Sequence, residues 1–144
     1  MSRYEYLLIK GALVYLVLTG LLGVVFFIDP ALAPYFRVTH VHLGVIGFFL
    51  SMVMGVAYWM MPRPGQLRQD GLEALTFYLL TAGLVLRVVA EPWWRYSGAE
   101  LPHLLGIVSA LLLFAAISTF AYAMQARVKT KDMILKLRES RERA

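Results

Sequence analysis

The sequence predicts an all-α membrane protein with four transmembrane helices in a bundle. Hydrophobic residues make up 60% of its 144 residues, and the mean hydropathy of +0.66 is higher than that of a typical soluble domain. Four long apolar runs are separated by short segments rich in proline, glycine and charge. A helix needs about 20 apolar residues to cross a bilayer, and each run approaches or exceeds that length.

The first two runs cover residues 7–28 and 38–61. The first carries one charge, Lys10, which lies close enough to the end to reach the interface. A secretory signal peptide is the alternative, but the apolar part is too long and no cleavage site is convincing. Asp29, Pro30 and Pro34 predict a short loop, and the Pro-Arg-Pro-Gly sequence at 62–65 ends the second run.

The other two runs cover residues 71–90 and 101–126. Asp70 or Gly71 is expected to cap the third helix, and the Glu-Pro pair at 91–92 to end it. Trp93, Trp94, Arg95 and Tyr96 then resemble an interfacial aromatic belt. Residues 127–144 mix charged and apolar side chains, which predicts an extension of the fourth helix, a surface-lying amphipathic segment or a solvated tail.

The charge distribution predicts the orientation. The net charge of +5 indicates a membrane-flanking tail and not nucleic-acid binding, because half of the basic residues lie in the last eighteen positions. Four spans put both termini on one side, which then carries most of the lysines and arginines, so the positive-inside rule predicts cytoplasmic termini and a multi-pass protein of a bacterial-type inner membrane. The basic residues expected on that side are Arg3, Lys10, Arg63, Arg68 and the seven from Arg127 onward, against Arg37, Arg87 and Arg95 on the other side.

The candidate site consists of the three histidines. His40 and His42 open the second helix and His103 opens the fourth, so all three are expected at similar depth near the outer face. A single histidine there is more often an interfacial residue bonded to water or backbone. Three together predict a bound haem or metal ion, because ionisable groups at membrane depth are functional candidates. The chain has no cysteine, which excludes thiolate ligands and a thiol nucleophile.

Small residues follow His40 and His103 along the same helix faces. Steps of three and four residues from His40 reach Gly44, Gly47, Ser51 and Gly55, and steps from His103 reach Gly106 and Ala110. Small residues on a membrane helix let another helix or a flat cofactor approach closely. The same steps from His42 reach bulky residues suited to lipid or to packing.

A haem requires an axial imidazole, an apolar slot and partners for its propionates. Partners are available near the outer interface in Arg37, Arg87, Trp93, Trp94 and Arg95. The alternatives are an ion pair between Arg87 and Glu91, one turn apart, and an ordinary belt role for the tryptophans.

A copper or zinc ion is the rival ligand, since His40, His42 and His103 together supply three imidazoles. The spacing of two residues weakens this interpretation, because the His40 and His42 side chains diverge by about 200° on a regular helix. Both reach one ion only if the helix begins after His40.

The sequence Arg37-Val-Thr-His40-Val-His42-Leu43, followed by Gly-Val-Ala-Tyr at 55–58 and Met-Pro-Arg at 61–63, resembles the second transmembrane helix of subunit I in the haem-copper oxidase and nitric oxide reductase superfamily. In the reductases an arginine precedes the ligand of low-spin haem b by three residues, so the resemblance implies His40 as a ligand. Related oxidase-like proteins carry His-x-His-Leu here, which keeps His42 as a candidate. The partner-metal histidines of that superfamily lie in helices that this chain lacks, so the resemblance does not imply a complete oxidase.

Subunit I of that superfamily is built from arcs of four helices, and this chain has the material for one arc. The resemblance therefore implies a homo-oligomer, for example a trimer, with haem between protomers. We expect a b-type haem protein that uses His40 and His103, with His42 as the alternative ligand. Its expected roles are electron transfer with a respiratory redox partner or binding of a diatomic gas. The alternatives are a copper- or zinc-binding membrane protein and a cofactor-free accessory subunit of a respiratory oxidase.

Overall fold

The computed structural model describes residues 1–62, 69–128 and 140, and all of its regular elements within these ranges are helical. Four spans are long and apolar enough to cross a membrane, namely Arg3–Ile28, Pro30–Met60, Asp70–Ser97 and Glu100–Gln125. The predicted all-helical class and the four membrane-length helices are therefore confirmed. The elements in chain order are α1 (Arg3–Ile28), η1 (Pro30–Leu32), α2 (Ala33–His42), η2 (Leu43–Leu50), α3 (Ser51–Met60), α4 (Asp70–Ser97) and α5 (Glu100–Gln125).

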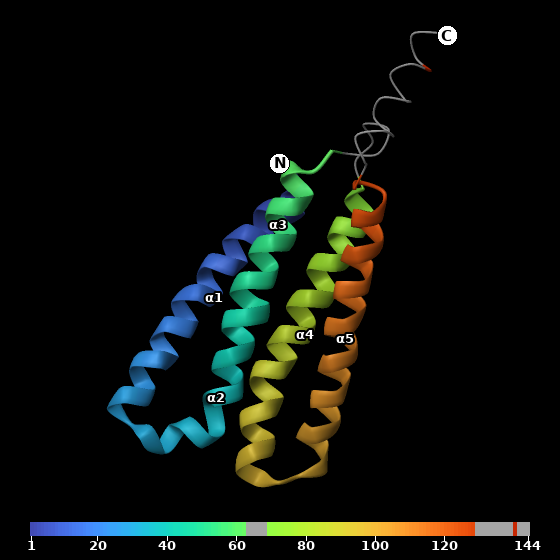
Figure 1. Ribbon diagram of the computed structural model, residues 1–144. Coiled ribbons are helices and arrows are strands. Elements are labelled where there is room, and N and C mark those ends of the chain that lie inside the picture. The colour runs from blue at the N-terminus through green and yellow to red at the C-terminus, as the bar shows by residue number, and fades with distance from the viewer. Residues whose placement is uncertain (63–68, 129–139, 141–144) are drawn as a thin grey trace.

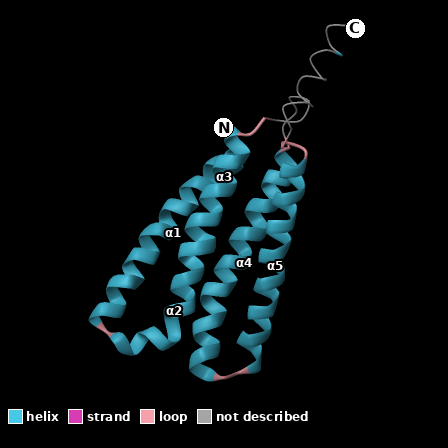
Figure 2. Ribbon diagram, viewed as in Figure 1, coloured by secondary structure: helices cyan, strands magenta, loops and turns pink. Residues whose placement is uncertain are grey.

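The four spans lie side by side in chain order (Figure 1). Helix α1 packs on η2 and α3, α2 packs on α4, and α4 packs along α5. Short loops join α1 to η1 and α4 to α5 (Figure 2). The end of the bundle that holds the N-terminus and Arg127 is called the terminal end below. The opposite end, which holds η1 and the turn between α4 and α5, is called the histidine end.

The second span changes its helical geometry directly after His42. Helix α2 begins at Ala33, earlier than expected, because Pro34 is accommodated in its first turn. The segment Leu43–Leu50 is a π-helix, and the Ser51 hydroxyl donates to the Ile46 carbonyl five residues earlier, at 3.2 Å. Such segments are frequent at functional sites. Here the π-helix sets the rotation of α2 relative to α3.

Helix α4 runs beyond its expected end at residue 90. Pro92 lies inside it, and the helix continues to Ser97 before Gly98 ends it in the left-handed conformation, with φ of 65° and its N–H bonded to the Trp94 carbonyl at 2.8 Å. The aromatic segment 93–96 is therefore the last turn of a helix and not a loop. Glu91 becomes an internal, buried residue of the span.

The glycines of the second span contact helix α1. A Cβ on Gly47 would lie 2.8 Å from Tyr15, one on Gly55 would lie 2.7 Å from Ile9, and one on Gly44 would lie 3.3 Å from the Thr19 side chain. Of the two occupants that small residues allow, the described structure places a helix on this stripe. The space next to these glycines is occupied by α1.

A polar network closes the terminal end. Arg127 and Glu73 form an ion pair of 3.0 Å with side-chain exposures of 0% and 1%. The same guanidinium donates to the Tyr58 carbonyl at 2.7 Å and to the Gln69 side chain at 3.0 Å, and it lies 5.0 Å from the centre of the Tyr58 ring. The sequence analysis predicted that Arg127 belongs to the charged tail. The structure places it in the core, where it joins the end of α5 to α3 and α4. The expected tail from 129 onward lies outside the described residues, apart from Ser140.

Substitution of Arg127 tests this network. We expect Arg127→Met to lower the free energy of unfolding by about 3–5 kcal/mol, because Glu73 is left charged and unpaired in the core. The double variant Arg127→Met/Glu73→Leu should regain much of the loss, and Arg37→Met, at an exposed site, should change it by less than about 1 kcal/mol. Unfolding in SDS, followed by circular dichroism, measures the three values. A double variant that is less stable than the single variant would contradict the prediction.

The glycine contacts allow a matched pair of substitutions. We expect Gly47→Ala to cost about 1–3 kcal/mol, because the added methyl group meets Tyr15 and Leu84 at 3.0 Å or less. Gly20→Ala should be neutral or stabilise the protein by up to about 1 kcal/mol, since nothing lies within 4 Å of its Cβ. The same SDS unfolding measurement compares them. Equal effects at the two positions would show that α1 does not pack on Gly47.

Candidate functional site

His40 faces helix α1. Its ring centroid lies 5.5 Å from that of Phe26, and a Cβ on Gly23 would lie 3.7 Å from its Cε1 atom. Its Nδ1 is buried and has no hydrogen-bond partner among the described residues. The ring is therefore enclosed in the contact between α1 and α2.

His42 faces helix α4 instead. Its Nδ1 lies 2.8 Å from the Val38 carbonyl and 3.6 Å from Glu91 Oε2. A carbonyl only accepts, so Nδ1 carries the proton and donates to Val38, while 3.6 Å is too long for a hydrogen bond to the carboxylate. This leaves Nε2 with a free lone pair, which is the arrangement of a metal-ligating imidazole.

Glu91 is a site residue whose burial the sequence analysis did not predict. It is 9% exposed, and its Oε1 lies 3.5 Å from an Arg95 nitrogen. Its Oε2 is buried without a hydrogen-bond partner in the described part of the chain. The signal available in the sequence was a lone acidic residue at the end of an apolar run, and the neighbouring Pro92 made it look like a helix end.

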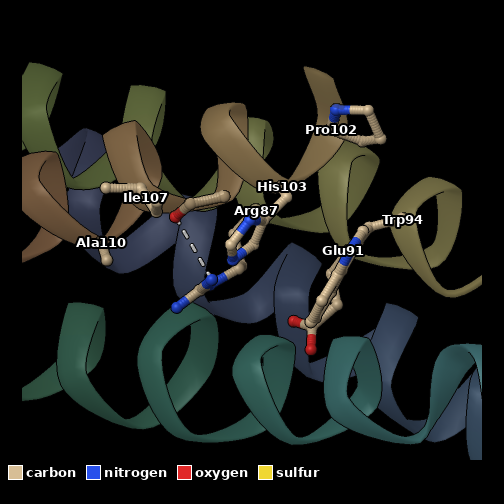
Figure 3. Close-up of a pocket in the computed structure, with 8 residues that line it drawn as sticks. Arg87, Glu91, Trp94, Pro102, His103, Ile107 and Ala110 are labelled. Atoms are coloured by element: carbon tan, nitrogen blue, oxygen red, sulfur yellow. Dashed lines mark hydrogen bonds between the residues drawn. The ribbon is translucent and has the colours of Figure 1, made fainter. Parts of the chain in front are cut away.

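His103 stands at the edge of a pocket between α4 and α5. The pocket has a volume of about 190 Å³, and the His103 ring stacks on Trp94 with centroids 4.9 Å apart and planes 20° apart. The Arg87 guanidinium and the Glu91 carboxylate extend from α4 toward the second span (Figure 3). The pocket is lined by Arg87, Glu91, Trp94, Pro102, His103, Gly106, Ile107 and Ala110.

Arg87 has no ion-pair partner among the described residues. One of its terminal nitrogens donates to the Gly106 carbonyl at 3.3 Å, and its Nε is buried without a hydrogen-bond partner. The Glu91 carboxylate forms its ion pair with Arg95 and lies 3.6 Å from the His42 ring. The pairing of Arg87 with Glu91 that the sequence allowed is thus not formed.

The structure brings some of the predicted site residues together and separates others. Arg87, Trp94 and His103 line one pocket, and Glu91 connects that pocket to His42. Arg95 lines a neighbouring, wider hollow of about 480 Å³ with Pro34, Tyr35, Trp94 and Gly98. Arg37 and Trp93 are exposed and line neither space. Within residues 1–62 and 69–128, no three histidine or acidic side chains are grouped closely enough to hold a metal ion.

Compared with protein-family models, curated proteins and solved structures, the chain matches none of them.

Helix α4 contains two buried glutamates with different surroundings, which permits a comparison. We expect Glu91→Leu to be neutral or to raise the free energy of unfolding by up to about 1–3 kcal/mol, because it removes a buried oxygen that lacks a partner. Glu73→Leu should lower it, since Arg127 would lose its counter-ion. Unfolding in SDS measures both. If Glu91→Leu destabilises the protein as much as Glu73→Leu, Glu91 has a structural role and not a binding one.

Proposed function

We propose that this chain is an inner-membrane protein with cytoplasmic termini that binds b-type haem at its histidine end. The observation that carries the proposal is His103, an exposed imidazole beside an apolar pocket that also contains an arginine without an ion-pair partner. When bound, the haem iron supplies one-electron transfer or binding of a diatomic gas. The protein residues would supply an imidazole ligand for the iron, the apolar surface and the partners of the propionates.

His103 fits the role of an axial ligand. Stacking on Trp94 fixes the plane of its ring. The ring also borders a second, open hollow of about 470 Å³, which is lined by Glu100, Leu101, Leu104 and Ile107 as well. His42 is the second candidate, because its Nδ1 proton is already donated to a carbonyl. His40, which the family resemblance favours, would first have to leave its contact with Phe26.

One chain covers only part of a haem. The pocket of about 190 Å³ is smaller than the roughly 300–1,000 Å³ of most enclosed ligand sites. The apolar residues Leu104, Ile107 and Leu111 of α5 are exposed next to it. We therefore propose that a second copy of the chain covers the part of the haem that extends beyond this pocket, and that a respiratory redox partner approaches from the outer side. Copper or zinc is less well supported, because the three histidines have three different surroundings.

Absorption spectra of the protein purified in mild detergent test this function. We expect a Soret band and sharp reduced bands of the b type after expression with adequate haem. His103→Ala should abolish the Soret band, His42→Ala should broaden the reduced bands and open a site for carbon monoxide, and His40→Ala should leave the spectrum unchanged. The three variants act as controls for one another.

If the purified protein contains no haem, further measurements distinguish metal binding from an accessory-subunit role. A wild-type protein without a Soret band would contradict haem binding. Metal analysis of that sample would then test for copper and zinc. If it also contains neither metal and co-purifies with an oxidase, the protein is an accessory subunit.

A further inference from the structure

Arg87 is a cation held inside an apolar span without a counter-ion. A guanidinium keeps its charge in proteins, and a charged group at membrane depth usually has a partner of opposite charge. The described residues give Arg87 one long bond to a carbonyl and leave its Nε buried and unpartnered. The arginine therefore requires an acceptor from outside the described chain.

The acceptor must also suit Glu91. Residues 87 and 91 are one turn apart on the same face of α4, and both line the pocket. Arg87 offers an unused donor, Nε, whereas the Glu91 carboxylate only accepts and already faces Arg95 at 3.5 Å. A carboxylate satisfies the arginine, because each of its oxygens can accept from the guanidinium. The charge of Glu91 remains balanced by Arg95.

Charge favours the same ligand. Arg87 and Arg95 carry two positive charges and Glu91 one negative charge, so this group has a net charge of +1 when His42 and His103 are counted as neutral. One monoanion neutralises it. A neutral alcohol or amide would supply hydrogen bonds but would leave the buried charge unbalanced.

The surroundings of the pocket are suited to an apolar body. Ile107 and Ala110 form its apolar wall on α5. An exposed ridge of Ile107, Leu111 and Phe114 continues from the pocket along the same face of α5. A carboxylate at Arg87 with a hydrocarbon chain on this ridge would use both surfaces.

We propose that the pocket between α4 and α5 is a carboxylate-binding site centred on Arg87, which takes the head of a membrane-borne monocarboxylate. The chemistry has two sources, a free fatty acid and a propionate arm of the proposed haem. If the ligand is a haem propionate, the inference rests on the proposed function. If the ligand is a fatty acid, the inference is independent of haem binding.

Fluorescence of Trp94, in a variant that also carries Trp59→Phe and Trp93→Phe, measures binding at the pocket wall. The probes are decanoate and decanamide, which have nearly the same shape but differ in charge and in one head-group atom, since the amide has an NH2 donor where the carboxylate has an acceptor oxygen. We expect decanoate to bind at least tenfold more tightly than decanamide. Arg87→Gln should remove this difference, and Arg37→Gln, at an exposed arginine outside the pocket, should preserve it.

Equal affinities for decanoate and decanamide, or equal decanoate affinity in the wild type and Arg87→Gln, would overturn the proposal. Partition into detergent is the same for all variants and cancels when a variant is compared with the wild type. The decanoate and decanamide affinities are each corrected for the partition of that probe into protein-free micelles. Because decanoate binding is measured without haem, a protein that lacks a Soret band still gives a decisive result for this site.

Competition then identifies the source of the carboxylate. If haem displaces decanoate while haem dimethyl ester does not, and Arg87→Gln weakens binding of haem but not of the ester, the propionate occupies the site. If decanoate binds equally with and without haem, the site belongs to a fatty acid. Both outcomes support a carboxylate site at Arg87.

Discussion

The bundle depends on the buried pair of Arg127 and Glu73. Outside this pair, α5 packs mainly on α4, whereas Arg127 reaches the backbone of α3 through Tyr58. Removal of one partner of a buried ion pair is strongly destabilising, because it leaves an uncompensated buried charge. Here the Tyr58 carbonyl and the Gln69 side chain also accept from the guanidinium, while Oε2 of Glu73 has no hydrogen-bond partner among the described residues. The network thereby fixes α4 and α5 against the second span at the terminal end.

The two ends of α4 use the same residue type in opposite ways. Glu73 and Glu91 are 18 residues apart, or about 27 Å along a helix, and both are buried. Glu73 is paired at 3.0 Å, while the contacts of Glu91 are 3.5 Å or longer. At the terminal end, Glu73 Oε1 and the Arg127 guanidinium hold the helices together, although Glu73 Oε2 has no hydrogen-bond partner among the described residues. Polar groups at the histidine end keep unused hydrogen-bonding capacity, which is what a binding site requires.

Hydropathy was sufficient to predict the helical class and the four spans, because spanning length and apolar composition are local properties of the sequence. The surroundings of the histidines were not predictable, because they depend on helix rotation. His40 and His42 face different helices, and the π-helix after them alters the rotation of the span. The glycines of the second span predicted a close contact but did not show whether a helix or a cofactor makes it. The predicted helix end at residue 90 was wrong because α4 continues through Pro92. The role of Arg127 was not predicted because this residue belongs to a run of charged residues that resembles a tail.

The π-helix has a consequence for how the site could change. Its wider turn accommodates an extra residue without disturbing α3, where Gly55 and Tyr58 are fixed by their neighbours. Loss of one residue between Leu43 and Leu50 would restore an ordinary helix and rotate α2 by about 100° relative to α3. His42 would then turn away from Glu91 while the bundle kept its packing at the terminal end. The imidazole that the second span presents to α4 therefore depends on the single extra residue that the π-helix accommodates.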